Sequence, residues 1–373
     1  MADAQTLTTA RSPLEHPPQL CEDELLGLIA EYARRPYTTV SVNQLFAFQW
    51  DKRPVDAKLL SVAEFLRGEL PVRLAHMAEM LAHMPGGLAQ TAAAQLVRGL
   101  YLRSFADVYT FPKLRGEEDC LKFIELVERI KMRHSRVVET MAKGILDLKE
   151  KVGDSIHDLN IAPALDAYYT TRIGTRVLIG HHAALRRHRP GWVGIICGQT
   201  SPATSAREAY HLATEVCRRY YSVAPKLTLL GHTELTFKYI PSHLRHIFFE
   251  LFKNSMRATI ETHGAKGTLP DIKVVIADGS EDVAIKISDE GGGIARTGLS
   301  KIWSYTYTTA MRPPESPYQD DFGAMAGYGH GLPLSRLYVR YFGGELQILS
   351  MHGYGTDAYM HLNKLGTNRE MLV

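Results

Sequence analysis

Residues 243–263 read HLRHIFFELFKNSMRATIETH, and the interpretation of the whole chain starts from this stretch. Its helical period places five polar residues on one stripe, at successive spacings of 4, 4, 3 and 4: His246, Glu250, Asn254, Arg257 and Glu261. The other sides of the helix carry mostly Phe, Leu, Ile and Met. A helix this apolar is largely buried, so its polar stripe needs a polar partner.

A metal-bound phosphate is one partner that this stripe could meet. Asn254 offers a carbonyl oxygen of the kind that Mg²⁺ accepts, and Glu250, one turn earlier, is placed to take a proton from an attacking hydroxyl. The alternative is a solvated helix face with ordinary i,i+4 pairs. The stretch alone leaves both interpretations open.

The composition is that of a globular protein from a reducing compartment. The chain has 373 residues, 45% hydrophobic and 22% charged, which is enough for two domains. The net charge is +3 and basic residues are mixed with acidic ones, which argues against nucleic-acid binding. Cys21, Cys120, Cys197 and Cys217 lie far apart in the sequence and are expected to be reduced thiols. No apolar run approaches the roughly 20 residues of a membrane span, so no membrane association is expected.

The first half of the chain has a helical pattern. Residues 1–18 are polar and are expected to form a flexible tail, and residues 19–187 are expected to form the first domain. The predicted helices are Glu22–Arg34, Ala57–Met84 with an interruption at Pro71, Leu88–Tyr109, Glu117–Lys151 and Ile156–Arg186. Helices of this length are typical of an antiparallel up-and-down bundle.

The pattern changes after residue 187, and a second domain is expected over residues 188–373. Its predicted helices are Ala203–Tyr221, His243–His263 and Leu332–Tyr341, and its predicted strands are Lys226–Leu230, Ile272–Ala277, Val283–Ser288, Leu346–Met351 and Thr356–Leu362. Turn residues join successive strands as hairpins. We therefore predict an α+β fold, in which an N-terminal antiparallel helical bundle is followed by an α/β sandwich with a mixed, largely antiparallel sheet and helices on one face.

Three further pieces of sequence carry possible ligand-binding groups. Asp289 ends the strand IKISD in phase with its buried positions, so its carboxylate needs a donor such as an adenine amino group, and Gly291 and Gly293 let the backbone approach a planar ligand. Residues 327–332 read GYGHGL and open a helix, which can cradle a phosphate with backbone amides. Thr356 begins the last strand, where its hydroxyl could reach the same pocket. Each piece taken singly also has an ordinary structural explanation.

In this order and spacing the pieces resemble the nucleotide-binding motifs of the ATPase and kinase superfamily that includes DNA gyrase, heat-shock chaperone ATPases, histidine kinases and mismatch-repair ATPases. The resemblance narrows to the mitochondrial pyruvate dehydrogenase kinases through ELFKNSMRA, SDEGGGIA, YTYTTA, MAGYGHGLPLSRLYVRYFGGELQI and MHGYGTDAY, and through FLRGELPVRLA, KMRHSRVV and TTRIGTRVLIGHH in the helical half. It covers the chain from about Leu20 to Leu365. It implies an ATP-dependent protein serine kinase that phosphorylates and inactivates the decarboxylase component of the pyruvate dehydrogenase complex.

The resemblance also implies roles for individual residues. Glu250 is expected to be the general base, and His246 to tune or orient it. Asn254 is expected to hold the Mg²⁺ that bridges the ATP phosphates. The other residues expected to bind ATP are Arg257, Asp289, Gly291, Gly293, Thr308, Thr309, Gly327, Tyr328, Gly329, His330, Gly331, Leu332 and Thr356. Lys253 points off the stripe and is expected to be structural.

A second site is expected inside the helical domain. Arg172 and Arg176 share one face of a helix, and buried guanidinium groups need anions. Tyr101 and Ser104 lie one turn apart on a neighbouring helix, and His134 could join them. Internal acidic residues could satisfy the arginines instead. In the family that the chain resembles, this pocket receives pyruvate and its analogue dichloroacetate, which inhibit the kinase.

The resemblance further implies a homodimer in the mitochondrial matrix that binds the lipoyl domain of the dihydrolipoyl acyltransferase core. Three alternatives stay open. The first is a kinase of the branched-chain 2-oxoacid dehydrogenase complex. The second is a histidine kinase, with His134 as a candidate acceptor, although no receiver-type partner module is present. The third is a nucleotide-gated scaffold that transfers no phosphate, against which the combination of Glu250, Asn254 and Asp289 argues.

Overall fold

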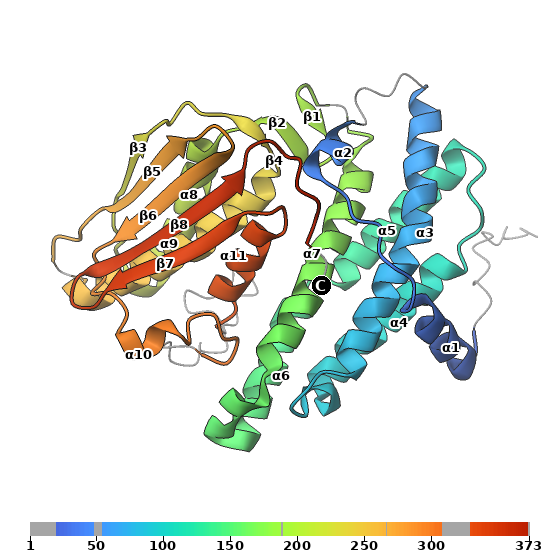
Figure 1. The fold of residues 1–373 in the computed structure, drawn as a ribbon, viewed down its shortest axis with the longest axis horizontal. Helices are drawn as coiled ribbons and strands as arrows, with labels where there is room; N and C mark the ends of the chain where they lie inside the picture. The colour runs from blue at the N-terminus through green and yellow to red at the C-terminus, as the bar shows by residue number, and fades with distance from the viewer. Residues whose placement is uncertain (1–19, 48–53, 188, 266, 308–328, 372–373) are drawn as a thin grey trace, which may run out of the picture.

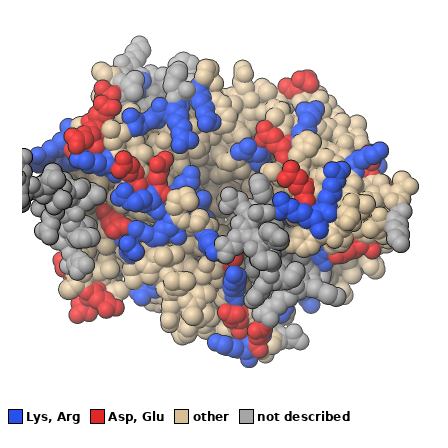
Figure 2. All heavy atoms as spheres, turned by 180° about the vertical axis from the view of Figure 1, so that it is seen from behind, with Lys and Arg blue, Asp and Glu red and all other residues tan. Residues whose placement is uncertain are grey.

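Two bodies of different architecture lie side by side in the computed structural model, which describes residues 20–47, 54–187, 189–265, 267–307 and 329–371. Figure 1 shows long helices on one side and a twisted sheet with its helices on the other. On the face drawn in Figure 2, Lys and Arg are interspersed with Asp and Glu. Within the described residues, no helix combines the length and the apolar character that crossing a membrane requires.

The first half of the described chain is helical, as predicted. Its α-helices are α1 (Glu22–Tyr32), α2 (Val42–Phe46), α3 (Val55–Ala82), α4 (Ala92–Tyr109), α5 (Glu117–Arg133), α6 (Val137–Val152) and α7 (Ile161–Ala184), and its 3-10 helices are η2 (Leu88–Gln90) and η3 (Gly153–Leu159). Helix α3 packs against α4 and α7, and α5 packs against α7. Leu74, Val97 and Tyr168 are 0% exposed in the core that these helices share.

The predicted helix Glu117–Lys151 is two helices. α5 ends at Arg133 and α6 begins at Val137, with a turn at His134 between them. The turn directs the His134 carbonyl toward α7, where Nη2 of Arg172 donates a hydrogen bond to it at 2.8 Å. The apolar residues of α5 and α6 follow one helical period, and both sets lie in the bundle core, so this period did not reveal the break.

Pro71 does not interrupt α3, contrary to the prediction. A proline inside a helix costs about 3 kcal/mol or more, because it removes one hydrogen bond and crowds the preceding turn. Leu70 and Leu74, both 0% exposed, flank Pro71 in the bundle core. Their burial, with that of the surrounding side chains, offsets the cost and keeps the helix continuous.

The second half combines two sheets with four helices within the described residues. Its strands are β1 (Trp192–Val193), β2 (Ile196–Thr200), β3 (Leu227–Gly231), β4 (Phe237–Tyr239), β5 (Ile272–Asp278), β6 (Asp282–Asp289), β7 (Glu345–Met351) and β8 (Gly355–Asn363), and its helices are α8 (Pro202–Tyr221), α9 (Pro241–His263), α10 (Arg296–Leu299) and α11 (Gly331–Arg340). The main sheet has the order β3-β5-β6-β8-β7, and β1-β2-β4 form a small second sheet that the sequence did not predict.

The main sheet is mixed and largely antiparallel, as predicted. β3 pairs with β5 in parallel, and the other neighbours pair antiparallel. Along β6, Val283, Ile285 and Ile287 alternate into the core, where Phe248 of α9 is also fully buried. Asp289 continues this alternation on the buried face at the end of the strand. The packing of this sheet against α9 therefore brings the Asp289 carboxylate next to α9.

The C-terminal segment returns to the helical half. The backbone N–H of Glu370 donates to the carbonyl of Val40, and the N–H of Val40 donates to the Glu370 carboxylate at 3.0 Å. That carboxylate also accepts hydrogen bonds from Nη2 of Arg73 at 2.5 Å and from the Tyr341 hydroxyl. Its side chain and that of Arg73 are 0% exposed. One hydrophobic core lies mainly in the helical half but also includes Ile240, Leu334 and Tyr341, and the other lies wholly in the second half. We infer two domains that meet near residue 188, with the C-terminal residues docked across the boundary.

Candidate functional site

Helix α9 carries the candidate site along one edge. Pro241 lies in its first turn, where the missing N–H costs no helical hydrogen bond, and the helix ends at His263. Leu251 is buried in the core, while the polar stripe faces away from it. Glu250 is partly buried and Asn254 is exposed, about 6 Å farther along the helix axis. The predicted stripe is therefore present, with its inner end at Glu250 and its outer end in solvent.

The Glu250 carboxylate lies between a lysine and the first residue of α11. Nζ of Lys253 is 2.9 Å from Oε1. A Cβ built at Gly331 would overlap Oε2, so the Gly331 backbone lies directly against the carboxylate. Burial by itself raises the pKa of Glu250, but Lys253 and His246 lower it, and the resulting pKa is below the ordinary value. Glu250 is therefore an anion at neutral pH, held at the positively polarised N-terminus of a helix.

The prediction that Lys253 points off the stripe is wrong. Its side chain is buried, and its ammonium group pairs with Glu250 at i,i+3 spacing. It also lies 4.8 Å from the centroid of the Phe249 ring. The sequence contained the signal for this pair, because residues three apart on a helix are neighbours. Lys253 is thus a member of the site that the sequence reasoning missed.

His246 lies one turn before Glu250, and its ring centroid is 4.7 Å from that of Tyr338 on α11. The same tyrosine contacts His243 at 4.8 Å. Burial lowers the pKa of His246, while Glu250 raises it and Lys253 lowers it. The imidazole is therefore neutral at pH 7. Its Nε2 is buried and has no hydrogen-bond partner within the described residues, which leaves this atom for a ligand or a water.

Asp289 lies where three protein groups donate to its carboxylate. The Ser255 hydroxyl of α9 donates at 2.7 Å, and the backbone N–H groups of Gly291 and Thr356 donate at 3.0 and 3.3 Å. Burial raises the pKa of Asp289, an effect that these three hydrogen bonds oppose. A carboxylate has about four acceptor positions, so one more donor can bind here. Ser255 was not predicted as part of the site.

The glycine segment after Asp289 packs tightly against α9 and the β7–β8 turn. A Cβ at Gly291 would clash with the side chain of Ala258, which lies on α9. Gly293 has a φ of 68°, and a Cβ there would clash with the Met351 carbonyl. The Thr356 hydroxyl lies 2.9 Å from that of Ser350. The structure therefore brings Asp289, Gly291, Gly293 and Thr356 together, as predicted.

The remaining predicted ATP-binding residues fall into three groups: those outside the described residues, those at the start of α11, and Arg257 on α9. Thr308, Thr309, Gly327 and Tyr328 lie outside the described residues. Gly329 and His330 precede α11, and Gly331 and Leu332 open it. Arg257 lies on the stripe, but its Nε donates to Oε1 of Glu261 at 2.7 Å, so an internal carboxylate already pairs with it.

The residues of this site suit a Mg²⁺ ion that phosphate oxygens and water hold more than protein side chains do. The exposed Asn254 carbonyl oxygen can serve as one hard ligand. Within the described chain, no group of three or more His, Cys, Asp and Glu side chains is arranged to hold a metal ion. Magnesium commonly binds through one or two protein oxygens together with phosphate oxygens and water. The arrangement therefore fits this ion without a dedicated protein cage.

A second candidate site lies inside the helical domain. A small cavity there is lined by Met77, Tyr101, Lys131, His134, Arg172, Thr175, Arg176 and Ile179. Nε of Arg172 and Nη1 of Arg176 are buried without a hydrogen-bond partner in the described part of the chain. Burial and the neighbouring Arg172 lower the pKa of Arg176. Two adjacent guanidinium groups with unused donors make the cavity attractive to a small anion.

Ser104 lies beside this second site without lining the cavity, and one lining residue was not predicted. The Ser104 hydroxyl lies 3.0 Å from Nε2 of the lining residue His134, as the predicted grouping implies. It also donates to the Leu100 carbonyl and accepts from Nη1 of Arg133, both at 2.8 Å. Lys131, which the sequence reasoning missed, does line the cavity. Burial lowers the pKa of Lys131, and Arg176 lowers it further. Burial also lowers the pKa of His134 to about 4, so this imidazole is neutral at pH 7.

Comparisons with known proteins agree over both halves of the chain. Residues 39–197 match the family model described as mitochondrial branched-chain alpha-ketoacid dehydrogenase kinase, and residues 239–365 match that of the histidine kinase-, DNA gyrase B- and HSP90-like ATPases. The chain is 43% identical to a mitochondrial pyruvate dehydrogenase (acetyl-transferring) kinase of Arabidopsis thaliana, over 89% of this chain and 92% of that protein. It is 42% identical to the Ascaris suum kinase of the same name, over 81% and 78%. Against isozyme 3 of Mus musculus, the identity is 37% over 91% and 84%.

Proposed function

The chain belongs to the family of the mitochondrial pyruvate dehydrogenase (acetyl-transferring) kinases, and we propose that it transfers the γ-phosphoryl group of ATP to a serine of the pyruvate dehydrogenase decarboxylase component and so inactivates it. The observation that carries the proposal is the Glu250 carboxylate. It is an anion that Lys253 holds against the N-terminus of α11, within a domain of the ATPase superfamily. This is the position of a base beside a phosphate-binding helix terminus.

ATP binding follows from the domain family, and we propose the groups that would meet the nucleotide. Asp289 would accept a hydrogen bond from the adenine amino group, since Ser255 and two backbone amides already orient its carboxylate. Gly329 to Leu332 would present backbone amides at the N-terminus of α11 to the phosphates. The adenine end and the phosphate end of the nucleotide would thus both lie beside α9.

Glu250 would act on the acceptor serine. The serine oxygen forms a bond to the γ-phosphorus, the bond from that phosphorus to the bridging oxygen of ADP breaks, and Glu250 takes the hydroxyl proton. Its lowered pKa makes it a weak base, which suits a loose transition state in which the hydroxyl loses its proton late. Its main contribution is therefore to orient the hydroxyl, and the neutral His246 one turn away would support that orientation.

Asn254 would contribute its side-chain oxygen to Mg²⁺. When bound, this ion would neutralise part of the negative charge of the ATP phosphates. Lys253 lies between Glu250 and Asn254 in sequence and brings a further positive charge to the same part of α9. The pairing of Lys253 with Glu250 reduces the repulsion between that carboxylate and the phosphate oxygens that would lie nearby.

Incubation with labelled ATP and a purified decarboxylase tests the proposal. Transfer to a serine of the pyruvate decarboxylase is expected. The branched-chain decarboxylase is the second candidate substrate, because the helical half matches the family model named for the branched-chain kinase. Transfer to the pyruvate decarboxylase should be the faster of the two. An acid-labile phosphoprotein would favour a histidine kinase, because phosphohistidine hydrolyses in acid. Tight ATP binding without any transfer would favour the scaffold.

We further propose that the cavity beside Arg172 and Arg176 binds a small carboxylate such as pyruvate or dichloroacetate. Three cationic side chains, including Lys131, line it, and two of their buried nitrogen atoms have no partner within the described residues. The cavity lies in the helical domain, so inhibition from there would act by changing how the two domains meet. Dichloroacetate is expected to inhibit the kinase, and this is measured as a loss of phosphate transfer.

Three statements about the cellular setting complete the proposal. We propose a homodimer formed through the open face and edge of the main sheet, where Leu349, Met351 and Tyr354 are 59%, 68% and 59% exposed. We also propose binding to the lipoyl domain of the acyltransferase core and a location in the mitochondrial matrix, since the relatives are named mitochondrial kinases. Light scattering tests the dimer, and stimulation by an isolated lipoylated domain, absent with the unlipoylated form, tests the partner.

A further inference from the structure

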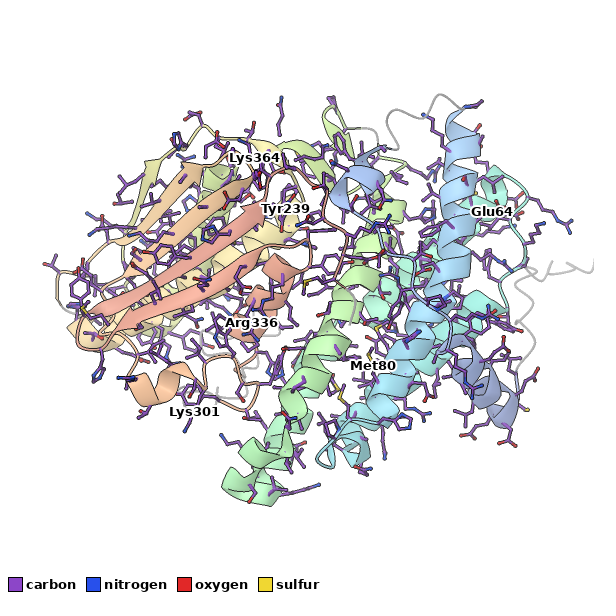
Figure 3. All side chains as sticks on the ribbon, in the orientation of Figure 1. Glu64, Met80, Tyr239, Lys301, Arg336 and Lys364 are labelled. Atoms are coloured by element: carbon purple, nitrogen blue, oxygen red, sulfur yellow. The ribbon has the colours of Figure 1, made fainter. Side chains whose placement is uncertain are left out.

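Helix α7 of the helical domain contacts the nucleotide-binding domain next to the start of α11. The Tyr305 hydroxyl donates a hydrogen bond to Oδ1 of Asp166 on α7 at 2.6 Å. Nη2 of Arg336, on α11, lies 3.6 Å from Oδ2 of the same carboxylate. Figure 3 labels Arg336 on the part of α11 that faces α7. One carboxylate of the helical domain therefore joins two separate segments of the other domain.

A cluster of three aromatic rings lies beside this carboxylate. Tyr169, one turn after Asp166 on α7, has its ring centroid 5.5 Å from that of Tyr305 and 6.0 Å from that of His330. The Tyr305 and His330 centroids are 5.1 Å apart. Tyr169 and Tyr305 are each 1% exposed and His330 is 5% exposed. Each ring contacts the other two, so the position of His330 depends on α7 as well as on its own domain.

His330 connects this cluster to the phosphoryl-transfer site. It directly precedes Gly331, whose backbone lies against the Glu250 carboxylate. Its carbonyl accepts the N–H of Leu334 at 3.0 Å, so His330 is fixed to the first turn of α11. A displacement of His330 would therefore move the Gly331 amide relative to Glu250. The Gly331 backbone and the Glu250 carboxylate are in close contact, so a displacement of a fraction of an ångström would alter that contact.

A second helix of the bundle holds the same segment. Nζ of Lys149, near the end of α6, donates to the carbonyl of Thr306 at 3.1 Å. Burial raises the pKa of Asp166, and the hydrogen bond from Tyr305 and the charge of Arg336 lower it. The carboxylate therefore has a favourable partner only while the two domains stay docked at this place.

We propose that Asp166 and Tyr169 are positioning residues for phosphoryl transfer. They hold Tyr305 and His330, and through His330 they fix the N-terminus of α11 against Glu250. Neither residue touches the nucleotide or the acceptor serine. The helical domain thereby completes the geometry of a site whose reacting groups all belong to the other domain. The inference rests on the proposed function, because it assigns the N-terminus of α11 to the ATP phosphates.

A double-mutant cycle on the full-length protein tests this assignment. Tyr305→Phe removes only the hydroxyl, and Asp166→Ala removes its acceptor. Each is expected to raise the Kd for ATP about three- to tenfold, the range for one lost hydrogen bond. The double variant should be no worse than Asp166→Ala alone, because that change already removes the bond from Tyr305 together with the Arg336 contact. Asp166→Asn keeps an acceptor for Tyr305 and should lose less than Asp166→Ala.

Tyr210→Phe is the matched control. It removes a tyrosine hydroxyl that donates to the Pro225 carbonyl at 3.0 Å within the same domain, and it should bind ATP like the parent. Thermal unfolding without nucleotide is measured for every variant. If Tyr305→Phe and Asp166→Ala lower the unfolding temperature but keep the parent's ATP Kd and kcat, or if their effects on Kd add, the contact is only structural and the inference is overturned.

Failure of the proposed function would look different. In that case the parent protein transfers no phosphate to either decarboxylase, although the ATP titrations of the cycle can still be carried out. Tyr169→Leu gives a second, independent measurement, because it removes the ring that contacts both Tyr305 and His330 without removing the Asp166–Tyr305 hydrogen bond. It is expected to lower kcat at saturating ATP at least threefold, and an unchanged kcat would contradict the role of Tyr169.

Discussion

Acidification is expected to destabilise the helical domain through His182, on α7. This side chain is 1% exposed and lines a small cavity with Leu59, Cys120 and Ile124. Burial lowers its pKa from 6.5 to about 4. Between these two values the unfolded chain binds a proton that the folded chain does not, so stability falls as the pH drops below 6.5. From pH 7.5 to 5.5, one such group loses about 1.4 kcal/mol of unfolding free energy.

Urea unfolding at both pH values, followed by far-UV circular dichroism, measures this loss in the parent and in His182→Leu. Leucine suits the apolar part of the lining, which Asp56, Glu117 and Arg186 complete, and it carries no proton. The variant should therefore lose about 1.4 kcal/mol less than the parent between pH 7.5 and 5.5. His352→Gln, at an exposed position in the β7–β8 turn, is the control and should keep the parent's pH dependence. If His182→Leu has the same pH dependence as the parent, the burial argument for this histidine is refuted.

Three predictions concern the two candidate sites. Glu250→Gln should keep the Kd for ATP within a few fold but lower phosphoryl transfer by about 10²-fold or more, as measured by label incorporation, and near-normal turnover would exclude Glu250 as the base. Asp289→Ala should abolish detectable ATP binding in a calorimetric titration, because the adenine amino group loses its charged acceptor; intact affinity would contradict the adenine assignment. Arg172→Ala should relieve inhibition by millimolar dichloroacetate and leave ATP binding intact, whereas a variant as sensitive as the parent would return both arginines to a structural role.

Much of the candidate site was predictable from local patterns. The stripe through Glu250 and Asn254 follows from the helical period alone, because side chains three and four apart share a face. The burial of Asp289 follows from the period of two along β6. The need for glycine at Gly291 and Gly293 follows from the absence of a Cβ, although only the structure identifies Ala258 and Met351 as the groups that would clash.

Other features required the folded chain because they join residues far apart in sequence. Lys131 lines the cavity beside Arg172 and Arg176 because α5, which ends at Arg133, packs against α7. Apolar periodicity is the same on both sides of the turn at His134, so it could not show the break between α5 and α6. Whether a polar side chain such as Ser104 has a free donor depends on its three-dimensional neighbours, here Leu100 and Arg133.

The sequence by itself therefore determined the α+β fold class and the family, and it predicted the two domains and the residues that would meet the nucleotide. These properties depend on periodicity and on residue chemistry, which are local. The tertiary structure decided which of these residues already have protein partners and how the domains meet, as in the pairing of Glu370 with Arg73 and of Asp166 with Tyr305. Buried charges and hydroxyl groups need hydrogen-bond or ionic partners, and these partners can come from residues far apart in the sequence. Such pairs leave no periodic pattern in the sequence that would predict them.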